Sequence, residues 1–358
     1  MNQVSKIEFI KANQLKEKPN SLEFGKHFTD YMFMMDYDGD QGWISPRIKP
    51  YEPISLSPAS FVLHYGQAVF EGLKAYKTRN GDPVIFRPDK HIARLNQSCE
   101  RLCIPTLDPD LMMEALTMLI DIEKDWIPEE EGTSLYIRPF VISTEPYLGI
   151  RPSHHYTFMI ILSPVGAYYS DGALNPVKIF VEDEYVRAVK GGVGHVKTPG
   201  NYAASMLAQE RANELGYEQV LWLDGKENKY IEEVGSMNIF FKINGEIYTP
   251  KLNGSILPGV TRDSVIHLVK DWGIPLHEER ISIEDLYKAH QSGQLEEVFG
   301  TGTAAVISPV GELKWEDKII TINDFQTGDF AKELYDTITG IQYGSKRDHY
   351  GWIKVVGK

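Results

Sequence analysis

The most informative stretch of this chain is Arg187-Ala-Val-Lys-Gly-Gly-Val-Gly-His-Val-Lys-Thr-Pro-Gly-Asn-Tyr202, which contains Lys197. Several glycines surround this lysine, and Pro199 follows it closely. Glycine permits positive φ angles and lets a backbone approach a ligand closely. A lysine held there, out of bulk water, can have a lowered pKa and attack carbonyls. The stretch therefore predicts a reactive lysine; the alternative is a flexible surface loop with a solvated lysine.

Two common glycine-rich motifs do not fit this stretch. A phosphate-binding P-loop ends in Gly-Lys-Ser/Thr, whereas Lys197-Thr198 follows a valine. A dinucleotide-binding fingerprint needs a third glycine three residues after the second, and Lys197 stands at that position after Gly194. The stretch therefore indicates neither a nucleoside triphosphate nor a dinucleotide.

A second informative stretch is Glu232-Glu233-Val-Gly-Ser-Met-Asn238-Ile-Phe-Phe. A lysine that forms a Schiff base and a carboxylate that binds a pyridinium nitrogen are what pyridoxal phosphate (PLP) requires of a protein. The two glutamates are adjacent, so on a strand they would point to opposite faces. The pairing of the two stretches predicts a PLP enzyme, with Lys197 preferred over Lys190 because Pro-Gly-Asn-Tyr follows it.

The second half of the chain resembles the signature of the class IV aminotransferases, which have PLP fold type IV. Glu233 to Phe240 leads into Ile247-Tyr-Thr249 and then Leu257-Pro-Gly-Val-Thr-Arg262. Four further motifs make nearly the whole chain, from about Phe24 to the C-terminal helix, similar to the branched-chain amino-acid aminotransferases. These motifs are Leu63-His-Tyr-Gly66, Val69-Phe-Glu-Gly-Leu-Lys74, Tyr136-Ile-Arg-Pro139 and Phe299-Gly-Thr-Gly-Thr-Ala304.

The resemblance implies a set of cofactor contacts. Lys197 is the Schiff-base lysine and the proton shuttle. Glu233, five residues before Asn238, is the partner of the pyridine nitrogen. Independently, the run from Leu257 into a helix predicts N–H groups that bind an anion. The residues expected to bind PLP are Arg94, Lys197, Tyr202, Glu233, Val260, Thr261 and Thr303. Arg101 is the alternative to Arg94 as the arginine that binds the phosphate. The alternative for Tyr202 is a structural role, as an aromatic residue packed at the start of a helix.

The resemblance also implies an aromatic substrate pocket, which suits the side chains of leucine, isoleucine and valine. Arg138 matches the arginine that accommodates the distal carboxylate of glutamate and 2-oxoglutarate. Each of these aromatic residues, taken alone, is more often part of a core. The residues expected to bind substrate are Tyr65, Phe70, Tyr136, Arg138, Tyr168, Ser236, Met237 and Ala304.

The expected activity is transfer of the amino group between L-leucine, isoleucine or valine and 2-oxoglutarate in a ping-pong reaction. The rivals are a D-amino-acid transaminase, a 4-amino-4-deoxychorismate lyase that releases pyruvate, and a binding module that only stores PLP. The resemblance further implies a homodimer in which the loop at Leu148-Gly-Ile150 reaches the pocket of the partner.

Strands and helices follow one another without a regular βαβ alternation, which argues against a doubly wound sheet and favours an α+β fold. We expect a small α/β domain over residues 1–165 and an interdomain linker rich in proline, glycine and small polar residues over 166–177. A large PLP-binding domain is expected over 178–358. By resemblance this domain is barrel-like, and the cofactor lies at the interface of the two domains.

Composition limits the possible partners. A net charge of −13 argues against a nucleic-acid surface and against an anionic membrane. No apolar run approaches the ~20 residues that span a bilayer.

The two cysteines, Cys99 and Cys103, are expected to be buried on one helical face. Such a low cysteine content fits a cytoplasmic location. His154-His155 is no metal motif, because adjacent side chains on a strand diverge, and we predict no metal.

Overall fold

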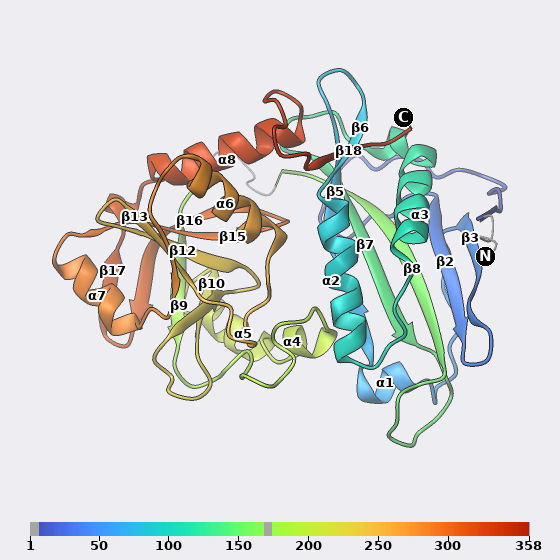
Figure 1. Cartoon of the computed structure of the whole chain (residues 1–358), viewed down its shortest axis with the longest axis horizontal. Helices are drawn as coiled ribbons and strands as arrows, with labels where there is room; N and C mark the ends of the chain where they lie inside the picture. The colour runs from blue at the N-terminus through green and yellow to red at the C-terminus, as the bar shows by residue number, and fades with distance from the viewer. Residues whose placement is uncertain (1–6, 168–173, 358) are drawn as a thin grey trace. The chain divides into compact units, whose positions relative to one another are not determined.

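The computed structural model describes residues 7–167 and 174–357, which form two compact units (Figure 1). The first comprises Met1–Tyr168, Val196–Pro199 and Gly340–Lys358, and the second comprises Tyr169–His195 and Gly200–Thr339. This division differs from the predicted one, because residues 196–199 and the C-terminal segment belong to the first unit. Part of the predicted linker, residues 168–173, lies outside the described residues.

A mixed sheet forms the first unit, with strand order β1-β3-β2-β8-β7-β5-β6-β18 and β4 paired with β7. Most neighbours are antiparallel, and β7 and β8 are the long central pair. The C-terminal strand β18 pairs with β6, which explains why the end of the chain belongs here. The strands are β1 (Glu8–Phe9), β2 (Tyr31–Asp38), β3 (Gly42–Pro50), β4 (Ala68–Phe70), β5 (Leu73–Lys77), β6 (Pro83–Phe86), β7 (Ser134–Ser143), β8 (His155–Val165) and β18 (Ile353–Val355).

Two helices, α2 (Pro88–Arg101) and α3 (Pro109–Ile122), cover one face of this sheet (Figure 1). Asp108 caps α3 by accepting from the N–H groups of Asp110 and Leu111, as expected for an N-cap aspartate. Apolar residues of both helices and of the inner sheet face form one buried core. The short helix α1 (Phe61–Tyr65) and the 3-10 helix η1 (Lys124–Trp126) complete the unit.

This unit also contains a buried acidic residue. Glu123 accepts a hydrogen bond from the Tyr31 N–H at 2.5 Å and is 2% exposed. Burial, reinforced by the charge of Asp30, raises the pKa of Glu123 to about 7 and outweighs the Tyr31 hydrogen bond. In the unfolded chain the carboxyl group has an ordinary pKa near 4.5. As pH rises from about 4.5 to 7, the unfolded state therefore loses this proton before the folded state does, and stability falls.

We expect Glu123→Gln to flatten this pH dependence. Glutamine can still accept from the Tyr31 N–H, and it carries no charge at any pH. At pH 8 the variant should be more stable than the parent chain by on the order of 2–3 kcal/mol, with little difference near pH 4.5. Urea unfolding at both pH values measures this. Equal stability of the two chains at pH 8 would contradict the assignment.

The second unit is built on another mixed sheet, with order β11-β10-β9-β16-β15-β12-β13-β14 and β17 paired with β16. The end strand β11 turns directly into β12, and Val234 bridges Met237 across that turn. The sheet therefore curls back on itself, as expected for a barrel-like domain. The strands are β9 (Val177–Glu182), β10 (Gln219–Leu223), β11 (Ile231–Val234), β12 (Asn238–Ile243), β13 (Glu246–Pro250), β14 (Leu276–Glu279), β15 (Leu295–Gly302), β16 (Val306–Trp315) and β17 (Lys318–Thr321).

The sequence predicts one helix from Tyr202 to Leu215 that Gly216 terminates, and the structure corrects the first part of this expectation. In place of one helix from Tyr202 to Leu215, two short helices, α4 (Pro199–Ala203) and α5 (Met206–Glu214), are separated at Ser205. The predicted terminator is confirmed, because Gly216 follows with a φ of 84°. The others are α6 (Val260–Asp271), α7 (Ile283–Gln291), α8 (Asp329–Gln342), whose last turn belongs to the first unit, and the 3-10 helix η2 (Asn323–Phe325).

The two cysteines do not share one environment, contrary to expectation. Cys99 is fully buried on α2, and burial raises the pKa of its thiol to about 12. Cys103 is exposed and lies beyond the end of α2 with a φ of 55°. The helix ends at Arg101, so the two side chains are not one helical turn apart.

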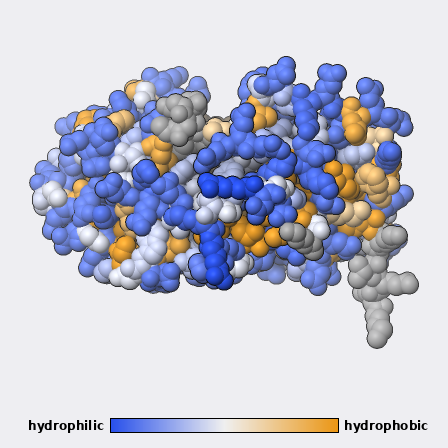
Figure 2. Space-filling view, turned by 90° about the horizontal axis from the view of Figure 1, so that it is seen from above, coloured by the Kyte–Doolittle hydropathy of each residue, from blue (hydrophilic) through white to orange (hydrophobic). Residues whose placement is uncertain are grey.

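The visible surface is largely hydrophilic, with small separate groups of hydrophobic residues (Figure 2). Within residues 7–167 and 174–357, no helix is long and apolar enough to cross a bilayer.

Candidate active site

Lys197 is tied into the first unit by its backbone. Its N–H donates to the Ser98 hydroxyl of α2 at 3.0 Å, and its carbonyl accepts from the Phe70 N–H at the end of β4 at 3.1 Å. The next residue, Thr198, donates its hydroxyl to the Ala68 carbonyl at 2.9 Å. These bonds fix the lysine between a helix and a strand.

The amine of Lys197 lies in a cationic and apolar environment. Its Nζ is 5.2 Å from the centre of the Phe70 ring. Burial and then the charge of Arg94 lower the pKa of Lys197 to about 8, against an opposing contribution from Glu71. The alternative lysine, Lys190, is exposed. Of these two candidates, Lys197 is the one whose surroundings favour a nucleophilic amine.

A second buried lysine, Lys74 on β5, has a pKa lowered to about 8 by burial. Lys74 ends the motif Val69-Phe-Glu-Gly-Leu-Lys74, and the sequence predicts no role for its side chain. Lys74 pairs in register with Tyr136 of β7, on the face opposite the buried core residues Leu73 and Ala75. It is therefore a competitor of Lys197 for any carbonyl ligand.

An aromatic cluster surrounds Arg138. Its guanidinium lies 4.7 Å from the centre of the Phe70 ring and donates from Nη2 to the Tyr136 hydroxyl at 2.9 Å. The Arg138 Nε is buried without a hydrogen-bond partner, and so is the hydroxyl of Ser163, which pairs in register with Tyr136. Unsatisfied buried polar atoms at one place are typical of a site that binds a polar ligand.

The arginine expected at the cofactor phosphate, Arg94, forms an ion pair with a residue that sequence reasoning missed. Its Nε and Nη2 donate to the two carboxylate oxygens of Glu71 at 2.7 and 2.9 Å. His91 contacts the same carboxylate through Nδ1 at 2.7 Å. Arg101, the competitor for the phosphate role, is exposed at the end of α2, whereas Arg94 is 7% exposed.

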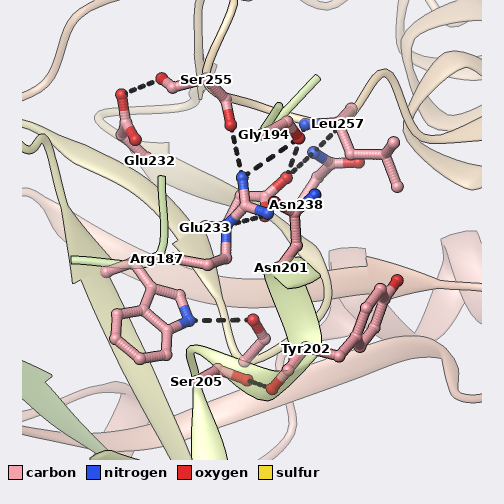
Figure 3. A network of polar contacts seen from close by, with 12 residues as sticks. Arg187, Gly194, Asn201, Tyr202, Ser205, Glu232, Glu233, Asn238, Ser255 and Leu257 are labelled. Atoms are coloured by element: carbon pink, nitrogen blue, oxygen red, sulfur yellow. Dashed lines mark hydrogen bonds and ion pairs between the residues drawn. The ribbon is translucent and has the colours of Figure 1, made fainter. Parts of the chain in front are cut away.

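In the second unit, Glu233 lies at the centre of the network drawn in Figure 3. Its Oε2 is 2.7 Å from Nε of Arg187, and both side chains are less than a tenth exposed. Its Oε1 accepts from the Leu257 N–H at 2.9 Å and from Nδ2 of Asn238 at 3.4 Å. One cation and two hydrogen-bond donors therefore surround this carboxylate.

Glu232 points into different surroundings, as the alternation of a strand requires. Its Oε1 accepts from the Asn253 amide at 2.9 Å and from the Ser255 hydroxyl. The Ser255 carbonyl in turn accepts from Arg187 (Figure 3). Close packing at this point requires Gly194, because a Cβ there would lie 2.1 Å from the Ser255 carbonyl oxygen. Glu232 therefore orders the loop that surrounds the Glu233–Arg187 pair.

The expected anion-binding residues begin a helix. Val260 and Thr261 are the first residues of α6, and its N-cap position is Gly259, which has no side chain. Such a helix start presents N–H groups and the positive end of the helix dipole. Thr303 is half-buried in the turn between β15 and β16.

Met237 lies against the Gly300-Thr-Gly302 backbone. A Cβ at either glycine would come within 3.0 Å of Met237, so the glycines permit close packing here and do not adopt positive φ. Ser236 is exposed and Ala304 half-buried. Tyr202 is half-buried in α4, and its carbonyl accepts from the Ser205 hydroxyl at 2.8 Å (Figure 3).

Two expected substrate residues remain, Tyr65 and Tyr168. Tyr65 is 41% exposed, packs on Phe61 and donates its hydroxyl to the Leu148 carbonyl. Tyr168 lies outside the described residues. No group of three or more potential ligands that could hold a metal ion occurs within the part of the chain that the structure describes.

Sequence reasoning missed three polar partners of the expected site residues, Arg187, Glu71 and His91. Arg187 is the first residue of the glycine-rich stretch, and Glu71 lies in the motif around Phe70. Both residues therefore belong to the motifs that predicted the site. A charge in a motif that is expected to be buried signals a partner, although the sequence does not name that partner.

Residues 68–313 match the family described as amino-transferase class IV. The chain belongs to this family, and its curled second sheet and paired α+β units agree with fold type IV. Branched-chain-amino-acid transaminase 1 of Bacillus subtilis (strain 168) is 63% identical over 348 residues, which cover 97% of this chain and 98% of that protein.

Two solved structures extend the comparison. The branched-chain amino acid aminotransferase of Escherichia coli is 30% identical with a TM-score of 0.76, covering 92% of this chain and 99% of that one. The branched-chain amino acid aminotransferase from T.th., complexed with N-(5'-phosphopyridoxyl)-L-glutamate, is 29% identical with a TM-score of 0.74, covering 91% and 98%.

Proposed function

We propose that this chain is a PLP-dependent transaminase that moves the amino group between L-leucine, isoleucine or valine and 2-oxoglutarate in a ping-pong reaction. The relatives named as branched-chain enzymes support the substrate class. The observation that carries the proposal is the setting of Lys197, whose amine has a pKa lowered to about 8 beside an aromatic ring and near Arg138.

Each unit offers side chains of the kinds that pyridoxal phosphate requires. Lys197 would hold its aldehyde carbon, Arg94 its phosphate and Glu233 its ring nitrogen, with Tyr202 at the phenolic oxygen. Val260, Thr261 and Thr303 would complete the phosphate site with N–H and hydroxyl groups. When bound, PLP supplies a carbon that accepts the amino group and a ring that takes up the electrons of the Cα–H bond.

Lys197 and Glu233 would each manage a proton. With a pKa of about 8, the Lys197 amine exists in both protonation states near neutral pH, which suits it to take a proton from substrate Cα and return it. The Glu233 carboxylate, which pairs with Arg187 and accepts from the Leu257 N–H, would accept a hydrogen bond from a protonated ring nitrogen.

The aromatic cluster around Arg138 would form the substrate pocket. Phe70 and Tyr136 offer apolar surface to a branched side chain, and Arg138 offers charge to the distal carboxylate of glutamate and 2-oxoglutarate. The buried Nε of Arg138 supports such a ligand, because it has no hydrogen-bond partner. Tyr65, Tyr168, Ser236, Met237 and Ala304 complete the proposed pocket.

Arg138→Ala should affect the two substrate classes differently. Removing a charge-assisted contact worth about 1.5–3 kcal/mol should lower kcat/KM for glutamate and 2-oxoglutarate by roughly 10- to 100-fold. Leucine, which has no distal charge, should lose about threefold or less. A matched control is Arg211→Ala, because Arg211 is exposed and pairs with Glu184. Equal losses for leucine and glutamate would mean that Arg138 has a structural role.

The proposed enzyme is a cytoplasmic homodimer. The side chains of Leu148 and Ile150 are 59% and 86% exposed, and the Tyr65 hydroxyl holds the backbone of this loop at Leu148. An apolar loop that projects from a single chain supports a role in the pocket of a second copy. The low cysteine content and the free thiols support a reducing compartment.

Steady-state rates with a panel of L- and D-amino acids test the proposed activity. L-leucine, L-isoleucine and L-valine should be the fastest amino donors, with 2-oxoglutarate as acceptor. Faster turnover of D-alanine would indicate a D-amino-acid transaminase, and pyruvate release from 4-amino-4-deoxychorismate would indicate the lyase. Cofactor binding without turnover of any of these compounds would leave only a PLP-storing module.

A further inference from the structure

A buried three-residue cluster links the turn after β4 to α2. Glu71 follows Phe70, whereas His91 and Arg94 stand three residues apart on one face of the helix. The Glu71 carboxylate receives the guanidinium fork of Arg94 at 2.7 and 2.9 Å and contacts Nδ1 of His91 at 2.7 Å. Its side chain is 1% exposed, and the other two are less than a tenth exposed.

The cluster is electrically balanced at neutral pH. Burial acts to raise the pKa of Glu71, but the charge of Arg94 and the hydrogen bonds of His91 and Arg94 outweigh it and hold this pKa well below its usual range. Burial lowers the pKa of His91 despite the neighbouring carboxylate, so the imidazole is neutral and donates from Nδ1. One carboxylate and one guanidinium therefore cancel.

This pairing fixes the direction of the arginine. A guanidinium is planar, so when its Nε/Nη2 edge faces a carboxylate, its Nη1 edge points the opposite way. Arginine otherwise has many rotamers, and ordering them lowers affinity for any anion that it binds. Glu71 therefore orders the side chain before an anion arrives.

The cluster is also coupled to the reactive lysine. The Ser98 hydroxyl donates to the Arg94 carbonyl at 3.0 Å and accepts from the Lys197 N–H at 3.0 Å. Arg94 and Glu71 act on the Lys197 amine in opposite directions, the first lowering and the second raising its pKa. Loss of Glu71 would therefore change both the orientation of Arg94 and the pKa of Lys197.

We propose that Glu71, held by His91, is a positioning residue that aims Arg94 and thereby sets the affinity of the chain for the phosphate group of its cofactor. This inference rests on the proposed function of Arg94 as a phosphate anchor. Glu71 itself contacts neither phosphate nor substrate in this account; it acts through the guanidinium.

The test compares two ligands that differ only in the phosphate. The full chain, freed of cofactor, is titrated with PLP and with pyridoxal, and binding is followed by absorbance. Glu71→Gln should raise the dissociation constant of PLP about tenfold or more and that of pyridoxal by about twofold or less. Glu123→Gln, which changes another buried carboxylate of the same unit, is the matched control and should alter neither.

Breaking a buried ion pair can unfold a protein, so a second pair of variants tests the proposal without removing the Glu71–Arg94 pair. His91→Gln keeps a neutral donor toward Glu71, whereas His91→Leu removes it. The leucine variant should weaken PLP binding about threefold without weakening pyridoxal binding, and the glutamine variant should bind PLP much as the parent does. Equal loss for both ligands, or no loss of PLP affinity in folded Glu71→Gln or His91→Leu, would overturn the proposal.

Arg94→Gln separates this inference from the function beneath it. If this variant binds PLP normally, Arg94 is no phosphate anchor and the proposed function of that residue fails. If Arg94→Gln is costly but Glu71→Gln is silent, only the positioning role fails. The double variant should bind PLP no more weakly than Arg94→Gln alone, because Glu71 acts through the arginine. Additive losses would contradict that route.

Discussion

Lys197→Ala is expected to abolish amino-group transfer and the visible absorbance that PLP gains when a lysine holds it. The variant removes the amine that would attack the cofactor aldehyde and also the base that would move the Cα proton. Loss of general base catalysis alone costs about a hundredfold to ten-thousandfold, so we expect turnover to fall by about a thousandfold or more. Activity with leucine and 2-oxoglutarate, together with the absorbance spectrum, measures both effects.

The fold should survive this change. The bonds that anchor the segment come from the backbone of Lys197 and from Thr198, and alanine keeps them. Removing a partly buried amine also relieves its desolvation cost. Thermal unfolding should therefore be unaltered or shifted upward. Lys190→Ala is the matched control, and retained colour with normal activity in Lys197→Ala would show that another lysine holds the cofactor.

Glu233→Gln is expected to retain PLP but to lose roughly 10- to 100-fold in turnover. A neutral amide does not hold a proton on the pyridine nitrogen, and a hydrogen bond to a charged group is worth about 1.5–3 kcal/mol. The pyridine nitrogen should also lose its proton, which nitrogen-15 NMR of labelled PLP detects directly. This readout distinguishes an effect on the ring from a general loss of structure.

The free energy of unfolding of Glu233→Gln has to be measured separately. Glutamine leaves Arg187 without its carboxylate partner in a buried place, and breaking a buried ion pair costs about 3–5 kcal/mol. Glu232→Gln is the comparison, since Glu232 orders the Asn253–Ser255 loop. If Glu232→Gln is crippling and Glu233→Gln is silent, the two glutamates have been assigned to the wrong roles.

Much of the fold could be predicted because its signals are local. The Asn244-Gly245 pair between two apolar runs predicts a β-hairpin, and the structure confirms it, because both residues have the positive φ angles of a type I′ turn. Residues 134–142 likewise read as a core strand and residues 88–102 have helical apolar spacing, and β7 and α2 lie there. The break at Ser205 was missed, because helix propensity along that stretch shows no interruption. The return of β18 to β6 depends on a contact across most of the chain.

In the site, too, contacts between distant positions could not be predicted. The residue types in the family's motifs predicted Lys197, Glu233, Arg94 and Arg138. Their partners could not be predicted, since Arg187 reaches Glu233 across 46 positions and Glu71 reaches Arg94 across 23. Charge pairing in a core depends on three-dimensional proximity, and adjacent sequence carries little information about it.

We expect Lys197, and no other lysine, to hold the cofactor. Borohydride reduction of the enzyme purified with PLP fixes the cofactor covalently to its lysine, and mass spectrometry of the digested chain locates it. Lys74 makes this a demanding test, because burial also lowers the pKa of Lys74 to about 8. We expect the phosphopyridoxyl group on the peptide that contains Lys197. Its recovery on Lys74, on Lys190 or on no lysine would contradict the account.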